Sequence, residues 1–161
     1  MHPEKTTFIR ETFPAILAQL KAEQKPAWGI MTPQHMVEHL SGAFAMSRGK
    51  FNLPLLIPVE RVPQSQAWLR SSKPFKKNTN GIGLEKGKLM PLRFANLDQA
   101  KEKLLAEIPK FYDFMASLEE GATFLHPAFG DLKPEDWEQF HFKHMFHHSV
   151  QFGLQEEKEA L

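Results

Sequence analysis

Four of the eight histidines in this 161-residue chain lie within eight positions of one another, in the sequence HFKHMFHHSVQFG. In an α-helix, successive residues advance by about 100° around the axis. His141, His144 and His148 would then fall within roughly 60° of one another on a single face. The spacing therefore predicts a stripe of imidazole side chains.

The rest of this segment predicts that the stripe is buried. Phe142, Phe146 and Val150 make a second face apolar, as expected for a helix that packs on more than one side. A neutral imidazole buried without partners costs about 1 to 3 kcal/mol, and a divalent cation would satisfy several imidazoles at once. His144 and His148 have the i, i+4 spacing that lets two ring nitrogens converge on one ion at roughly 2.0 to 2.1 Å.

A third ligand is expected from the sequence HMVEHL, where His39 shares a helical face with the apolar Met36 and Met46. Three neutral imidazoles leave coordination positions open, as in catalytic zinc sites. We therefore predict a metal site formed by His39, His144 and His148. Two other interpretations fit the spacing: a histidine cluster that responds to pH, and core histidines that are satisfied by hydrogen bonds.

Several other side chains are candidates for roles beside the ion. His35 and His141 are candidates for proton transfer or for orienting a ligand. His35, Glu38 and His39 also spell H-x-x-E-H, the motif of inverted zinc peptidases, but that architecture needs a further acidic ligand and a much longer chain. We therefore rank the peptidase assignment lower. The residues expected to line the pocket are Met36, His126, Trp137, Gln151 and Phe152.

The composition narrows the classes of partner. The 20 basic and 19 acidic side chains leave a formal net charge of +1, which gives no global attraction to nucleic acid or to an anionic membrane. The absence of cysteine restricts a metal site to nitrogen and oxygen ligands. No apolar run has the length of a signal peptide or a membrane span. We expect a cytoplasmic protein that binds a small molecule, without nucleic-acid or membrane partners.

Hydrophobic periodicity and cap residues predict four helices. Thr32 followed by Pro33 marks the start of the second helix, and Gly49 marks its end. Pro14 predicts a kink or a late start in the first helix, and Pro109 a bend or a break in the third. The helices are expected at about 6–21, 33–49, 96–121 and 134–157.

The connection between the second and third helices, at about 50–94, is too long for an ordinary loop. It should therefore contain short elements of its own or cover a site. From Arg61 to Arg93 it holds eight basic residues and one acid, Glu85. A solvated surface loop and a lid that attracts anions both fit this composition. The sequence GKLMPLRF is either a short strand or simply extended.

Two stretches, WGIMTPQHMVEHL and HPAFGDLKPEDWEQFHFKHMFHHSVQFG, resemble the DinB-like (YfiT-like) superfamily of metal-binding four-helix bundles, in particular a subgroup with this late motif and no assigned function. The resemblance implies an up-down-down-up bundle over nearly the whole chain, with a zinc, nickel or iron ion on His39, His144 and His148. It also implies frequent homodimers. Characterised relatives include thiol-dependent S-transferases and a maleylpyruvate isomerase, in which the metal activates a thiol. His35 stands where the superfamily is expected to have an uncharged residue such as glutamine.

Together, these observations predict an all-α protein that forms a single four-helix-bundle domain over 1–161. Its expected cofactor is a divalent metal ion, zinc or nickel before iron. The expected function is that of a metal-dependent hydrolase or thiol S-transferase, which acts on a small-molecule substrate or thiol cofactor as a homodimer. The alternative is a non-catalytic bundle that binds metal or senses a ligand.

Overall fold

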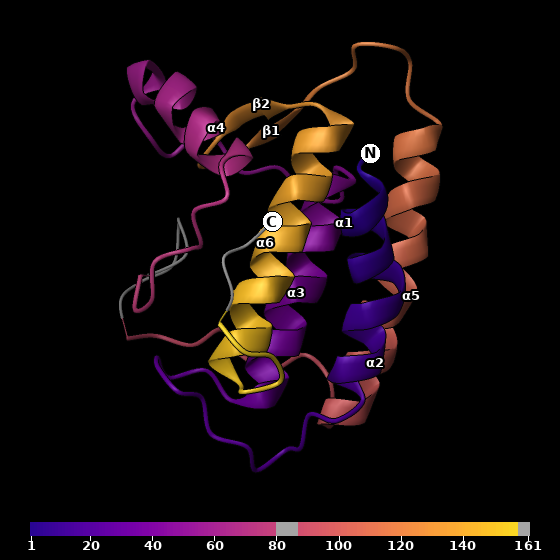
Figure 1. The fold of residues 1–161 in the computed structure, drawn as a ribbon, viewed down its shortest axis with the longest axis vertical. Helices are drawn as coiled ribbons and strands as arrows, with labels where there is room; N and C mark the ends of the chain where they lie inside the picture. The colour runs from indigo at the N-terminus through magenta and orange to yellow at the C-terminus, as the bar shows by residue number, and fades with distance from the viewer. Residues whose placement is uncertain (80–86, 158–161) are drawn as a thin grey trace.

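The structure, a computed structural model, describes residues 1–79 and 87–157 and is mostly helical (Figure 1). Its elements in chain order are α1 (Pro3–Thr7), the π-helical η1 (Phe8–Thr12), α2 (Phe13–Leu17), α3 (Pro33–Ser47), the 3-10 turn η2 (Val59–Arg61), α4 (Val62–Arg70), α5 (Leu97–Ala116), β1 (Phe124–His126), β2 (Gly130–Leu132) and α6 (Pro134–Gln151).

The long helices form an up-down-down-up bundle, as predicted. The continuous run α1–η1–α2 and α6 point one way along the bundle, and α3 and α5 point the other way (Figure 1). α3 packs against both α5 and α6, which brings the two predicted ligand-bearing helices together. None of the helices in the described residues has the length and apolar character that crossing a bilayer requires. The core shared by these helices includes Phe13, Phe44, Leu104, Phe111 and Met145.

The first helical run is displaced from its predicted position, since it extends from Pro3 to Leu17 rather than over 6–21. Its five π-helical residues directly precede α2, in which Pro14 is the second residue. Pro14 has no N–H to donate to the preceding turn, and the wider π turn pairs the N–H of Phe13 with the carbonyl of Phe8. The proline is therefore accompanied by a change of helix type and not by a late start.

Thr32 caps α3, as predicted, and Asn96 caps α5 in the same way. Thr32 Oγ1 and Asn96 Oδ1 each accept the backbone N–H three residues further on, at 3.3 and 2.9 Å. Pro109 lies inside α5 without ending it. The helix ends at Ala116, before the predicted end at Gly121.

α6 ends at Gln151 and not at the predicted Glu157, because Gly153 adopts a φ of +64° that terminates the helix. Before α6, the HPAFG turn joins β1 to β2 in an antiparallel hairpin. Gly130 in this hairpin has a φ of +68°, and a Cβ atom there would lie 2.7 Å from Val62 Cγ1. Glycine is therefore required where the hairpin packs on the start of α4.

The connection between α3 and α5 contains short elements, as predicted: η2 and α4. Its last described part, from Gly87 on, forms no strand. Instead, Arg93 and Phe94 donate their backbone N–H groups to the buried carboxylate of Glu38, at 2.8 and 3.2 Å. Residues 80–86, which include Glu85 and two of the glycines predicted to belong to the connection, lie outside the described residues.

Lys143 of α6 holds the C-terminal end of α4. Its ammonium group donates to the backbone carbonyls of Trp68, Leu69 and Ser71, at 3.1, 3.3 and 3.1 Å. The same group lies 3.9 Å from the centroid of the Trp68 ring. Burial lowers the pKa of Lys143 to about 8. These contacts tie the connection to the helix that carries two of the predicted metal ligands.

Candidate metal centre

The three predicted ligands meet at one point between α3 and α6. His39 Nε2 lies 2.8 Å from His144 Nε2, which in turn lies 3.2 Å from His148 Nε2. His144 and His148 are buried, and His39 is half-buried. Two nitrogens on a tetrahedral zinc ion, each at about 2.1 Å, would lie roughly 3.4 Å apart. Small shifts of the rings would therefore accommodate an ion.

The hydrogen bonds around these rings fit a shared cation better than imidazoles alone. Gln151 Nε2 donates to the Trp28 carbonyl at 2.8 Å, which leaves Gln151 Oε1 to accept from His148 Nδ1 at 2.7 Å. The proton of His148 is therefore on Nδ1, and its Nε2 presents a lone pair to the cluster. A single N–H on His144 Nε2 cannot satisfy both His39 and His148, whereas one cation accepts a lone pair from all three rings.

The second nitrogens of the two ligands on α6 are held differently. Gln151 orients His148, whereas His144 Nδ1 is buried with no hydrogen-bond partner among the described residues. Side chains that hold the second nitrogen of a ligating histidine fix its tautomer and the direction of its ring. His148 is therefore the better oriented of the two ligands on this helix.

Burial keeps all three rings neutral at neutral pH. It lowers the pKa of His39 to about 4, with a smaller contribution from the charge of His147. Burial also lowers the pKa of His144 and His148 well below the usual 6.5, and the neighbouring histidines add to this effect. Neutral imidazole is the form that binds a metal ion. The three rings therefore do not have to release a proton before they bind a metal ion.

The H-x-x-E-H motif is divided among three different environments. His39 belongs to the three-histidine cluster, and His35 Nδ1 lies 2.6 Å from Thr32 Oγ1 at the start of α3. Glu38 accepts from the backbone of the connection and from Arg93 Nε at 3.2 Å. The glutamate thus holds the connection against α3 and does not face the cluster as a peptidase base would.

His141 lies on the same helical stripe as the ligands, but its ring is satisfied within the core. Its Nε2 lies 3.0 Å from Ser47 Oγ, and its ring stacks on that of Phe44 with the centroids 3.8 Å apart. Ser47 Oγ itself donates to the Phe44 carbonyl at 3.0 Å, so His141 is the donor in its contact with Ser47. The proton-transfer roles of His35 and His141 stay predictions.

Among the predicted pocket residues, Gln151 hydrogen-bonds a ligand directly, as described above. Met36 and Trp137 are fully buried in the core, and Phe152 is buried just beyond the last turn of α6. Their predicted contact with a bound ligand stays a prediction.

His126, also predicted to line the pocket, is buried beside the β1–β2 turn. Its Nδ1 accepts the Ala128 backbone N–H at 3.0 Å, and its Nε2 has no hydrogen-bond partner among the described residues. The ring centroids of Trp137 and Phe140 lie 5.1 and 4.5 Å from its own. Burial lowers the pKa of His126 to about 3.

This histidine predicts a loss of stability in acid. Between pH 6.5 and about 3, the unfolded chain binds a proton at His126 and the folded protein does not. The free energy of unfolding should therefore fall with decreasing pH in this range, by about 1.4 kcal/mol per pH unit for this group. His126→Asn keeps an acceptor for the Ala128 N–H and cannot titrate, so its slope should be shallower. Urea unfolding in chelator between about pH 4 and 7 measures both slopes, and equal slopes would contradict the prediction.

Two further side chains, those of Phe75 and His147, lie beside the cluster, although neither belongs to the predicted stripe of histidines. The ring centroid of Phe75, in the connection, lies 6.0 Å from that of His144 and 5.9 Å from that of His147. His147 also packs against Trp28 at 5.3 Å and against His148 at 5.2 Å. The sequence contains a signal for His147, because it is one of the four histidines within eight positions. Phe75 has no such signal, because it is a single aromatic residue in a polar stretch.

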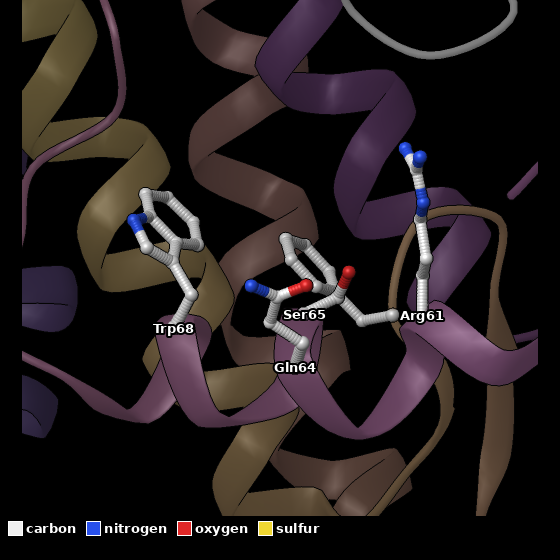
Figure 2. Close-up of a pocket in the computed structure, with 5 residues that line it drawn as sticks. Arg61, Gln64, Ser65 and Trp68 are labelled. Atoms are coloured by element: carbon white, nitrogen blue, oxygen red, sulfur yellow. The ribbon is translucent and has the colours of Figure 1, made fainter.

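A separate hollow lies along α4 and is not formed by the three ligands. Its volume is about 300 Å³, and Figure 2 shows Gln64, Ser65 and Trp68 along α4, with Arg61 just before the helix. The hollow is linked to the three-histidine cluster only indirectly, since the ring of Trp68 packs on that of Phe75 at 5.1 Å and the ring of Phe75 packs on that of His144. Its lining residues are Arg61, Gln64, Ser65, Trp68 and Phe129.

Comparison with known proteins relates part of the chain to a family. Residues 76–154 match the family described as "Protein of unknown function (DUF1569)". The matched part contains α5, the hairpin and α6 with His144 and His148, whereas His39 lies before it. Searches of the curated proteins and of the solved structures gave no match.

Proposed function

We propose that His39, His144 and His148 bind one divalent metal ion, zinc or nickel before iron, and that the protein is a metal-dependent enzyme acting on a small molecule. The reaction class that fits is hydrolysis or thiol transfer by a DinB-like bundle. The observation that carries the proposal is the convergence of three buried or half-buried imidazoles, from two helices, within 4.8 Å of one another.

The residues in and around the cluster would have different roles in holding the ion. Three neutral imidazoles hold the ion without neutralising it, and a three-residue ligand set leaves a position for water or substrate. Gln151, fixed by the Trp28 carbonyl, keeps His148 in the tautomer that can bind. A bound divalent ion would lower the pKa of a water or thiol in the open position and polarise an electrophile.

The fold supports the DinB-like part of the proposal. The two helices that carry the histidines are neighbours in an up-down-down-up bundle (Figure 1), as the resemblance of the two motifs implies. The homodimer, the cytoplasmic location and the use of a thiol cofactor stay predictions.

Element-resolved mass spectrometry of protein purified without a polyhistidine tag tests the metal site. We expect about one equivalent of metal per chain in the wild type and less than about a tenth of that in His39→Ala, because two imidazoles on one helix hold an ion weakly. His35→Ala is the matched control, since it removes a histidine from the same helix outside the cluster. It should keep the metal. Equal metal contents in His39→Ala and the wild type would remove the proposal.

A further inference from the structure

Phe75 belongs to an otherwise exposed segment, but its ring packs among the rings of other side chains. Within 72–79, every side chain is exposed except that of Phe75, which is half-buried. We call the four rings around it the Phe75 seat. They are those of Trp68, Phe140, His144 and His147, with centroids 5.1, 6.4, 6.0 and 5.9 Å from the Phe75 centroid.

The seat adjoins the proposed metal ion, since His144 belongs to both. Buried side chains close the cluster from within the bundle: Phe140, which also belongs to the seat, is 6% exposed and has its centroid 5.1 Å from that of His144, and Gln151, 4% exposed, bonds His148. Phe75 and its neighbour His147 are half-buried. Because the Phe75 ring packs against that of His144, a small molecule that takes its place lies directly beside the cluster.

The surroundings of the seat are cationic. Lys143 Nζ lies 5.9 Å from the Phe75 centroid, beneath the connection. The exposed stretch around Phe75 carries Lys73, Lys76 and Lys77 and no acidic residue, although Lys77 pairs with the exposed Glu157 at 2.7 Å. A dication on three neutral imidazoles would add to this positive field. The site should thus favour an anion.

We propose, building on the proposed metal site, that the Phe75 seat is the subsite for the apolar part of the ligand, and that the ligand is a small anion with a flat apolar body. Such a ligand displaces the Phe75 ring and places its anionic group on the metal. The aromatic walls suit a flat apolar group, since ring pairs at 4.5 to 7 Å attract one another beyond simple area burial.

Because Phe75 competes for its own seat, it lowers the apparent affinity of such a ligand. The apparent dissociation constant equals the intrinsic one divided by the fraction of molecules in which the seat is free. Removing the ring should therefore tighten binding of an anion with a flat body and affect a small anion without one much less.

Cobalt-loaded protein gives a direct test, because its visible absorption changes when an anion binds the metal. Benzoate is the probe with a flat body, and acetate is the probe with the same carboxylate and no ring. We expect the ratio of benzoate to acetate affinity to rise at least about tenfold in Phe75→Ala relative to the wild type. Phe75→Leu, a smaller occupant, should give an intermediate ratio. Phe51→Ala, which removes an exposed phenylalanine elsewhere in the connection, should leave the ratio unchanged.

The outcomes separate this inference from the proposed function. If the wild type binds no cobalt, or binds it equally after His144→Ala, the metal site fails and the inference fails with it. If cobalt binds through His144 but the ratio is the same in the wild type, Phe75→Ala and Phe75→Leu, the metal site stands and the Phe75 subsite is excluded. Circular dichroism of each variant confirms that it is folded, and Phe75→Leu decides the matter should Phe75→Ala not fold.

Discussion

Zinc is expected to raise the free energy of unfolding of the wild-type protein, and His144→Ala is expected to abolish that rise. His144 Nε2 contacts both other ligand nitrogens, at 2.8 and 3.2 Å, so its removal takes away the centre of the cluster. At free zinc about 100-fold above the dissociation constant, binding to the folded state alone contributes about 2.7 kcal/mol. Urea unfolding with and without zinc, followed by far-ultraviolet circular dichroism, measures this difference.

The comparison is made within each protein, with zinc against without it. The cost of the cavity that His144→Ala leaves in the core therefore cancels. His147→Ala is the matched control, because His147 lies on the same helix beside the ligands but outside the group of three. It should retain most of the zinc-dependent stabilisation. A rise of the same size in His144→Ala as in the wild type would mean that zinc binds elsewhere.

The convergence of His39, His144 and His148 could be predicted because the geometry of this cluster is largely local. His144 and His148 share one helix, so their spacing alone places both rings on one face. His39 could be chosen because it shares a face with apolar residues and therefore points inward. The remaining requirement, that α3 lies beside α6, follows from the bundle topology (Figure 1).

What could not be predicted depends on partners far apart in the chain. His141 looks equivalent to His144 in the stripe, but Ser47, 94 positions earlier, satisfies it in the core. The seat of Phe75 is built from rings of α4 and α6 that no pattern within the connection reveals. Local periodicity assigns a side chain to a face, whereas the neighbour across that face decides whether the side chain binds a ligand or fills the core.

The buried carboxylate of Glu107 also depends on a partner far away in the chain, which local periodicity does not reveal. Removing its charge is expected to destabilise the protein strongly. Glu107 of α5 is 2% exposed and pairs with Arg48 at the end of α3 and with Lys103 Nζ at 2.7 Å. The side chain of Arg48 is itself only 10% exposed. Glu107→Gln leaves this buried cation without its counter-charge, so the free energy of unfolding should fall by about 3 to 5 kcal/mol.

Two further variants show whether the lost counter-charge causes the effect. Glu102→Gln, on the exposed side of the same helix, should change the free energy of urea unfolding by less than about 0.5 kcal/mol. Replacing both partners with apolar residues, Arg48→Met with Glu107→Leu, should recover most of the loss, because a well-packed apolar pair needs no counter-charge. If Glu107→Gln costs no more than Glu102→Gln, the ion pair contributes nothing to holding α3 on α5. α3 would then be held on α5 without a measurable contribution from this ion pair.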